Sequence, residues 1–225
     1  MKNPLFYKNG KPFFSVGAQT SNSSSACGEL VARDCRAAKK LGMNTIAAAV
    51  TWELLEPEEG VFSFEQTDML IRTASQHGLN LVVLWFGTWK NGNSHYVPGW
   101  VKRDHARFRW ALSADGTPVR SLSPHCKATF EADRKAFLAL CRHITETDRD
   151  GTVLAIQIEN EPGLIGTMRD HSEEATALFR APVPGEVETL TGKSGTWEDV
   201  YGFYAPEYFT AWHIARYIDD LAVAA

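Results

Sequence analysis

Apolar residues change their spacing several times along the chain. Short continuous apolar runs alternate with longer segments in which apolar residues recur every three or four positions. The runs predict buried strands at residues 13–19, 43–50, 79–86 and 152–158. The periodic segments predict helices at residues 29–41, 65–77 and 129–145, and one from Pro206 onward. The last helix has the apolar stripe Tyr208, Ala211, Trp212, Ala215, Ile218 and Leu221.

A hairpin is predicted before the first of these strands. Residues 5–8 and 11–14 flank Asn9-Gly10. This dipeptide favours a type I′ turn, which requires a positive φ at both central residues.

The repeated order of strand and helix predicts an α/β fold with a parallel sheet and right-handed crossovers. A doubly wound sheet and a barrel both fit this order. No glycine-rich phosphate loop follows the first strand, and the long loops follow strands while the turns after helices are short. This asymmetry favours a (β/α)8 TIM barrel, whose functional face is built from the loops after its strands.

The length of the chain limits how much of a barrel it holds. A barrel of eight units needs about 250 residues before insertions, whereas the fourth strand is reached only at Thr152 of 225 residues. We therefore expect residues 1–225 to be the N-terminal part of a single catalytic domain, with about the first four βα units.

Composition argues against several classes of partner. The net charge is −4 and no basic block exceeds a pair, so we expect neither nucleic acid nor a membrane as partner. Residues 1–7 contain no apolar signal segment, which makes a cytoplasmic location the default expectation. The four cysteines lack metal-ligand spacing, and Cys35 and Cys141 fall on apolar helix faces. We expect no metal, cofactor or disulfide framework; the oligomeric state stays open.

The segment with the strongest functional character is 152–163, in which an apolar strand runs into Glu159, Asn160 and Glu161. Burying such groups in a scaffold is unfavourable unless each is hydrogen-bonded. At the end of a barrel strand they would face the cavity where chemistry occurs. Pro162 prevents a helix from starting there. Glu161 is therefore the candidate catalytic residue.

Strict alternation along this strand would place Gln157, Glu159 and Glu161 on one face. Asn160 could then reach the cavity only if regular strand geometry ends before it. We expect Glu159 to be a buried, hydrogen-bonded structural carboxylate rather than the catalyst.

Two further loops carry groups suited to a sugar, which presents both CH faces and hydroxyls. Trp52 and Glu53 directly follow the second strand. Trp89, Lys90 and Asn91 follow the third and combine a flat apolar ring with hydrogen-bonding groups. These five residues are candidate substrate contacts.

Together these segments resemble the retaining glycoside hydrolases of clan A, most closely the β-galactosidases of family 35. Residues 156–163 are similar to the acid/base motif of that family, and Asn44-Thr45-Ile46 with Trp52 and Glu56-Pro57 to its second-strand signature. Residues 14–25 resemble the first strand and Asn-Ser-Ser loop of a bacterial subgroup, which implies substrate contacts from Gln19 and Asn22.

The resemblance implies a hydrolase that removes terminal β-galactosyl residues, with Glu161 as general acid/base and Asn160 holding the 2-hydroxyl of the sugar. The nucleophile of the family is a Glu at the end of the seventh strand, expected beyond residue 225, so this part alone should be inactive. The acids at Glu173, Glu174, Glu186, Glu188 and Glu198 lie in polar sequence away from strand ends. The alternatives are another clan A activity (a family 42 β-galactosidase or a β-glucanase) and a non-catalytic carbohydrate-binding fragment.

Overall fold

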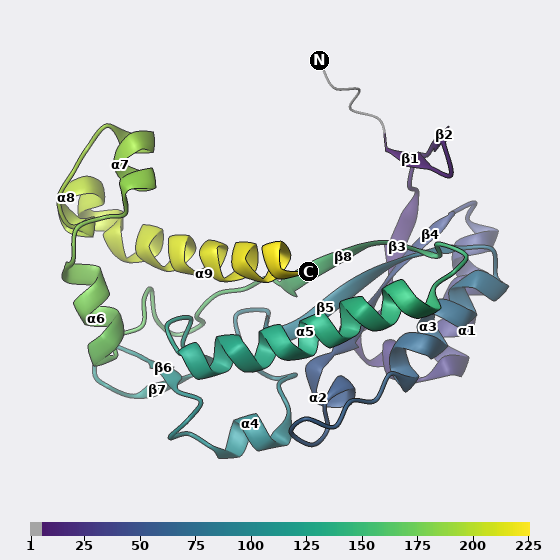
Figure 1. Cartoon of the computed structure of the whole chain (residues 1–225), viewed down its shortest axis with the longest axis horizontal. Coiled ribbons are helices and arrows are strands. Elements are labelled where there is room, and N and C mark those ends of the chain that lie inside the picture. The colour runs from purple at the N-terminus through teal and green to yellow at the C-terminus, as the bar shows by residue number, and fades with distance from the viewer. Residues whose placement is uncertain (1–5) are drawn as a thin grey trace. The chain divides into compact units, whose positions relative to one another are not determined.

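The computed structural model describes residues 6–225 (Figure 1). They form two compact units. The first unit contains residues 6–50, 64–84 and 144–157, and the second contains residues 51–63, 85–143 and 158–225. Leu5, at the start of the predicted hairpin, lies outside the described residues.

The predicted hairpin is present in the first unit. Strands β1 (Tyr7–Lys8) and β2 (Lys11–Pro12) pair antiparallel. Asn9 has a φ of 51° and Gly10 a φ of 72°. Two consecutive positive φ angles are the geometry of a type I′ turn, which confirms the prediction.

A sheet of four strands has the order β3-β4-β5-β8. Its strands are β3 (Gly17–Gln19), β4 (Thr45–Thr51), β5 (Asn80–Lys90) and β8 (Val153–Asn160). β3 and β4 pair in parallel, with Ala18 opposite Ile46. The predicted α/β class with a parallel sheet is therefore confirmed.

The first strand of this sheet is shorter than the sequence indicated. Only Gly17–Gln19 pair, and all three residues are exposed, so the prediction of a buried core strand at 13–19 was wrong. The reason is position, because β3 is an outer strand of the described sheet and has a strand neighbour on one side only. The apolar residues Phe14 and Val16 of this run are accordingly 83% and 44% exposed.

Helices cover the strands of the first unit as predicted. A short 3₁₀ helix (Asn22–Ala26) precedes α1 (Gly28–Lys40), which packs against α3 (Glu65–Gln76). α1 buries Val31, Cys35 and Ala38. Soon after these helices Gly42 and Gly78 adopt φ angles of 76° and 61°. Glycine favours this left-handed conformation, which explains why both helices end there.

The second unit contains several short elements that the sequence analysis treated as irregular. They are α2 (Trp52–Leu55), α4 (Gly99–Arg103), the hairpin of β6 (Trp110–Leu112) and β7 (Pro118–Leu122), α6 (Glu173–Arg180), α7 (Gly185–Thr191), α8 (Trp197–Tyr201) and a 3₁₀ turn (Gly202–Tyr204). The longer helices are α5 (Lys127–Thr147), of which residues 127–143 belong here, and α9 (Ala205–Ala224). Elements of about five residues are too short to show a helical period.

Helix α9 buries a different face from the predicted one. Its buried residues are Ala205, Phe209, Ile214, Tyr217 and Leu221, so of the predicted stripe only Leu221 is fully covered. Ala211, Ala215 and Ile218 instead line a hollow of about 460 Å³ with Pro162 and Gly163. The helix is apolar on two sides, and spacing alone did not distinguish them.

In the described part of the chain, no helix has the length and apolarity to cross a bilayer.

The buried face of α9 meets an aromatic cluster that contains two histidines. Trp197 and Phe209 lie in its core. The His125 ring stacks on Phe209 at 5.1 Å between centroids, and His213 lies 4.5 Å from His125. Burial lowers the pKa of His125 to about 4 and that of His213 to about 3.

This burial makes stability depend on pH in a defined direction. Between the lowered pKa values and about 6.5, the unfolded chain binds more protons than the folded protein. The stability that the folded protein gains from keeping these histidines neutral is therefore complete above pH 6.5 and is lost as the pH falls. Replacing His213 by Phe keeps an aromatic ring and removes one titration. Between pH 7 and pH 5, the free energy of unfolding of the wild-type protein should fall by about 2 kcal/mol more than that of His213→Phe. Urea unfolding at the two pH values measures both. Equal losses would contradict a buried neutral His213.

Candidate active site

The chain leaves regular strand geometry at the end of β8. Glu159 has a φ of 61° and Glu161 a φ of 48°, which is the left-handed region that residues other than glycine rarely adopt. Strict alternation therefore stops at Glu159. The sequence analysis required regular strand geometry to end before Asn160 if its side chain was to reach the cavity, and the backbone meets that requirement. Asn160 is 7% exposed, whereas Glu161 is exposed.

The end of β5 holds this turn through its main chain. Asn91 and Gly92 also have positive φ angles, of 53° and 64°. The Asn91 N–H donates to the Asn160 carbonyl at 3.0 Å, and the Gly92 N–H donates to the Glu161 carbonyl at 2.8 Å. Two left-handed turns thus face each other at the ends of β5 and β8. Their hydrogen bonds fix the main chain of Asn160, the proposed sugar-binding residue, and of Glu161, the proposed catalytic acid.

The carboxylate of Glu159 is buried between the same strands. It is 1% exposed. Its Oε1 accepts a hydrogen bond from the Thr88 N–H at 2.8 Å, and its Oε2 accepts one from the Trp89 N–H at 2.6 Å. The expectation that Glu159 is a buried, hydrogen-bonded carboxylate is confirmed.

A second buried acid, Asp133 of α5, lies against Glu159. Its Oδ1 accepts from Trp85 Nε1 at 2.9 Å, and its Oδ2 accepts from the hydroxyls of Thr88 at 2.7 Å and Tyr217 at 2.9 Å. Burial, and then the charge of Asp133, raise the pKa of Glu159 well above its usual value. Burial and the same charge also raise the pKa of Tyr217.

The sequence analysis did not single out Asp133, although one signal was present. Asp133 lies three, four and seven residues before the apolar residues Ala136, Phe137 and Leu140, all of which are buried. An acid on the apolar face of a helix has to find hydrogen-bond donors in the core.

The structure gives the two candidate tryptophans packing partners. Trp52 and Trp89 are both 0% exposed. Trp52 Nε1 donates to Glu56 at 2.9 Å, and Trp89 lies edge-on to Tyr217 with centroids 4.7 Å apart. Neither ring presents an open face in this structure. Stacking of a sugar on either one stays a prediction to which the burial lends no support.

Of the polar candidates in these loops, Glu53 and Asn91 lie nearer to the surface, whereas Lys90 is buried. Glu53 is half-buried and pairs with Lys102 at 3.3 Å. Lys90 lies 5.2 Å from the centroid of the Phe86 ring and hydrogen-bonds to the exposed side chain of Asn91. Because the Asn91 N–H donates to the Asn160 carbonyl, Asn91 and its neighbour Lys90 adjoin the proposed site in space.

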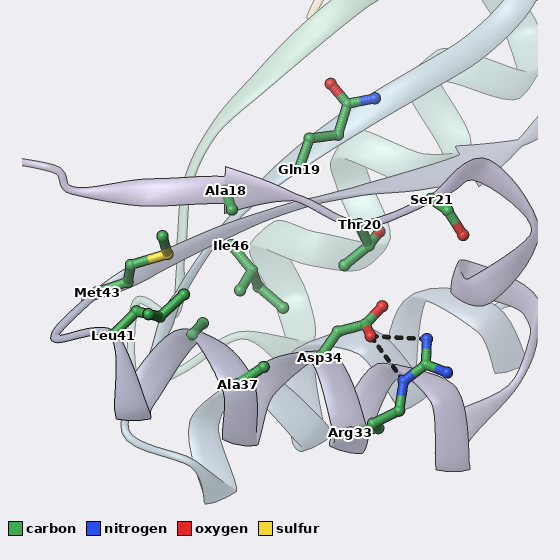
Figure 2. Close-up of a pocket in the computed structure, with 11 residues that line it drawn as sticks. Ala18, Gln19, Thr20, Ser21, Arg33, Asp34, Ala37, Leu41, Met43 and Ile46 are labelled. Atoms are coloured by element: carbon green, nitrogen blue, oxygen red, sulfur yellow. Dashed lines mark hydrogen bonds and ion pairs between the residues drawn. The ribbon is translucent and has the colours of Figure 1, made fainter.

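The remaining candidates, Gln19 and Asn22, belong to the first unit. Gln19 is exposed at the end of β3. Figure 2 shows its side chain on the side of β3 opposite to Asp34 of α1, near a hollow of about 300 Å³ between β3, α1 and β4. Asn22 begins the 3₁₀ helix. Their contact with substrate stays a prediction.

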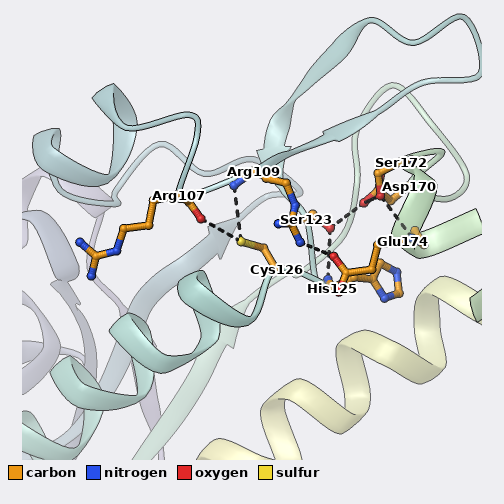
Figure 3. Close-up of polar contacts among 9 residues, drawn as sticks. Arg107, Arg109, Ser123, His125, Cys126, Asp170, Ser172 and Glu174 are labelled. Atoms are coloured by element: carbon orange, nitrogen blue, oxygen red, sulfur yellow. Dashed lines mark hydrogen bonds and ion pairs between the residues drawn. The ribbon is translucent and has the colours of Figure 1, made fainter.

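The segment that follows Glu161 is tied back to the β6–β7 hairpin. Asp170 is fully buried and accepts hydrogen bonds from the hydroxyls of Ser123 at 2.6 Å and Ser172 at 2.9 Å (Figure 3). The Leu112 N–H donates to it at 3.0 Å, and Ser121 bonds to the Gly163 carbonyl at 3.0 Å. These contacts fix both ends of the loop after Glu161, and the sequence analysis had not found them.

Other acids considered from the sequence lie on helices. Glu173 and Glu174 are in the first turn of α6, Glu186 and Glu188 in that of α7, and Glu198 in that of α8. Among residues 6–225, no group of three or more His, Cys, Asp or Glu side chains is placed to hold a metal ion.

A comparison with family models identifies the family of this chain. The comparisons support the resemblance to the glycoside hydrolases of clan A. The model of glycoside hydrolase family 42, described as β-galactosidase, matches residues 9–203, and the chain belongs to that family. The closer resemblance to family 35 is not confirmed; family 42 was the alternative.

The chain is also similar to individual relatives and solved structures. The β-galactosidase BbgII of Bifidobacterium bifidum is 24% identical over 189 residues, which are 83% of this chain and 26% of that protein. The β-galactosidase structure from Halorubrum lacusprofundi matches with a TM-score of 0.57 and 22% identity over 79% of this chain and 25% of that one. The β-galactosidase from Marinomonas ef1 matches with a TM-score of 0.57 and 17% identity over 88% and 29%.

These relatives indicate the type of fold and how much of a full-length protein this chain covers. The structures are TIM-barrel glycosidases, which supports the barrel type of α/β fold. The chain spans about a quarter of the length of the relatives that it matches.

The buried acids leave no room for a side chain at Gly87. A Cβ there would stand 2.3 Å from Trp85 Nε1, 2.7 Å from Glu159 Oε1 and 2.8 Å from Asp133 Oδ1. We expect Gly87→Ala to lower the free energy of unfolding by about 1–3 kcal/mol, because the core is overpacked. Gly185→Ala is the matched control, since nothing lies within 4 Å of its Cβ position. Urea unfolding measures both, and equal effects would contradict the close approach.

Proposed function

We propose that this chain supplies the acid/base part of a retaining β-galactosidase, with Glu161 as general acid/base. The observation that carries the proposal is the turn after β8. An exposed carboxylate stands there beside Asn160, with its main chain held by Gly92. Membership of family 42 supports the reaction class.

In the proposed mechanism Glu161 acts twice. It first donates its proton to the glycosidic oxygen as the bond to the anomeric carbon breaks. It then removes a proton from the water that attacks the glycosyl-enzyme, which regenerates the acid. The amide of Asn160 is proposed to bind the 2-hydroxyl of the sugar. Lys90, Asn91, Glu53, Gln19 and Asn22 are proposed as further substrate contacts.

A retaining mechanism needs a second carboxylate about 5–5.5 Å from the first, on the other side of the scissile bond. We propose that this nucleophile lies outside residues 1–225. Residues 1–225 would then be the N-terminal part of one barrel domain, containing about the first four of its eight βα units. The short coverage of the relatives supports this.

The first test removes the proposed acid. Glu161→Ala, in a protein that carries both carboxylates, should slow hydrolysis of alkyl β-galactosides by about 10²–10⁴-fold. Aryl galactosides with good leaving groups need little protonation and should lose less in the glycosylation step. Added azide should restore turnover and give β-galactosyl azide. Initial rates and product analysis measure these effects.

The matched control is Glu173→Ala, which removes an exposed acid from the first turn of α6 in the same unit. Its rates should equal those of the wild type. If Glu161→Ala slowed both substrate types equally and gave no azide product, the acid/base role would be excluded.

The second test concerns the chain taken alone. Purified residues 1–225 should not hydrolyse nitrophenyl β-galactoside, because the nucleophile is missing. A longer protein that contains the remaining strands should do so. Turnover by the 225-residue chain, abolished by Glu161→Gln, would show that the nucleophile lies within it. Galactose binding without turnover in the longer protein would favour the non-catalytic alternative.

A further inference from the structure

Glu159 occupies a place in the sheet that a main-chain carbonyl would normally fill. Its two carboxylate oxygens accept from the consecutive N–H groups of Thr88 and Trp89. The Lys90 N–H donates to Asn93, and just beyond β5 the N–H groups of Asn91 and Gly92 donate to the main-chain carbonyls of Asn160 and Glu161. The side chain therefore continues the ladder between β5 and β8 where the left-handed turn interrupts it.

The partner of Glu159 comes from α5 and is enclosed by donors. Asp133 accepts from Trp85, Thr88 and Tyr217. The two acids also lie against each other, because Glu159 Oε1 and Asp133 Oδ1 stand 2.7 Å and 2.8 Å from the point that a Cβ on Gly87 would occupy. A hydrogen bond between the two side chains contributes to the raised pKa of Glu159. Two carboxylates can share a hydrogen bond only if a proton lies between them.

We propose that Glu159 and Asp133 form a positioning pair that fixes the Glu159–Glu161 turn and thereby the orientation of the acid/base Glu161. This inference rests on the proposed function of Glu161. Neither residue has to touch substrate. Glu159 holds the turn to β5, and Asp133 ties Glu159 to α5 and, through Tyr217, to α9.

The hydrogen-bond pattern makes the two acids unequal. The proposal places the shared proton on Glu159 Oε1, which then accepts from the Thr88 N–H and donates to Asp133. A carboxylic acid hydroxyl can do both, and an amide NH₂ cannot. The other oxygen faces the Trp89 N–H. At Asp133, an amide nitrogen in the Oδ2 position can donate to the hydroxyls of Thr88 and Tyr217, because each hydroxyl can accept a hydrogen bond as well as donate one. Asp133→Asn is therefore compatible with the cluster, and Glu159→Gln is not.

The first experiment measures hydrogen exchange of individual amides by NMR in the two variants. We expect Glu159→Gln to lower the protection of Thr88, Trp89, Asn91 and Gly92 at least tenfold, and Asp133→Asn to change it less than threefold. Glu161→Gln is the control, since it leaves the pair intact and should not alter these amides. Unchanged protection in Glu159→Gln, or equal losses in both variants, would overturn the proposal.

The second experiment uses steady-state kinetics in a protein that carries both carboxylates. Glu159→Gln should lower kcat about 10- to 100-fold with little change in KM, and alkyl galactosides should be affected more than aryl ones. Asp133→Asn should stay within threefold. A role limited to stability would leave kcat per folded molecule unchanged, which would contradict positioning.

A measurement on the unaltered protein keeps the test decisive if Glu159→Gln does not fold. Infrared spectra at neutral pH should show the carbonyl band of a protonated carboxyl, shifted by ¹³C-labelled glutamate. Absence of this band would overturn the shared proton. If Glu161→Ala shows no leaving-group dependence while the exchange pattern holds, the proposed function fails and the holding role of the pair remains.

Discussion

The second unit depends on two carboxyl groups buried side by side. Two main-chain N–H groups donate to Glu159, and an indole and two hydroxyls donate to Asp133. An arrangement of this kind is unfavourable unless every oxygen is satisfied. Here the donors come from β5 and α9, so the acids, on β8 and α5, connect four elements that are far apart in the chain. The proposed site is built on that connection.

The sequence predicted those parts of the fold in which local pattern and tertiary role agree. Helices α1 and α3 were found within one residue of their observed ends because a stripe and a terminating glycine act together. The 152–163 segment stood out because polar groups at the end of an apolar strand are costly to bury. The position of Glu161 after β8 follows from the same local signal.

Other features depend on contacts that no local pattern encodes. Trp52 and Trp89 look alike in sequence whether a ring faces a cavity or the core, and the structure places both in the core. The two apolar sides of α9 differ only in what lies opposite them. Asp133 becomes meaningful only once Glu159 is beside it. Composition and spacing describe what a residue can do, whereas the choice among its roles belongs to the tertiary structure.

The left-handed conformations at Glu159 and Glu161 also bear on how this site can evolve. Each such residue other than glycine is destabilised by about 1–2 kcal/mol relative to the ordinary conformation. At position 161, selection for a stable fold alone would favour glycine or asparagine, and Asn9 and Gly10 show that solution in the N-terminal hairpin. A glutamate in this conformation at position 161 fits the proposed acid/base role, in which stability is given up for chemistry. In a descendant that has lost the function, substitutions should accumulate at position 161 first. Replacing Glu161 by glycine or asparagine would relieve backbone strain and leave the buried pair Glu159 and Asp133 intact.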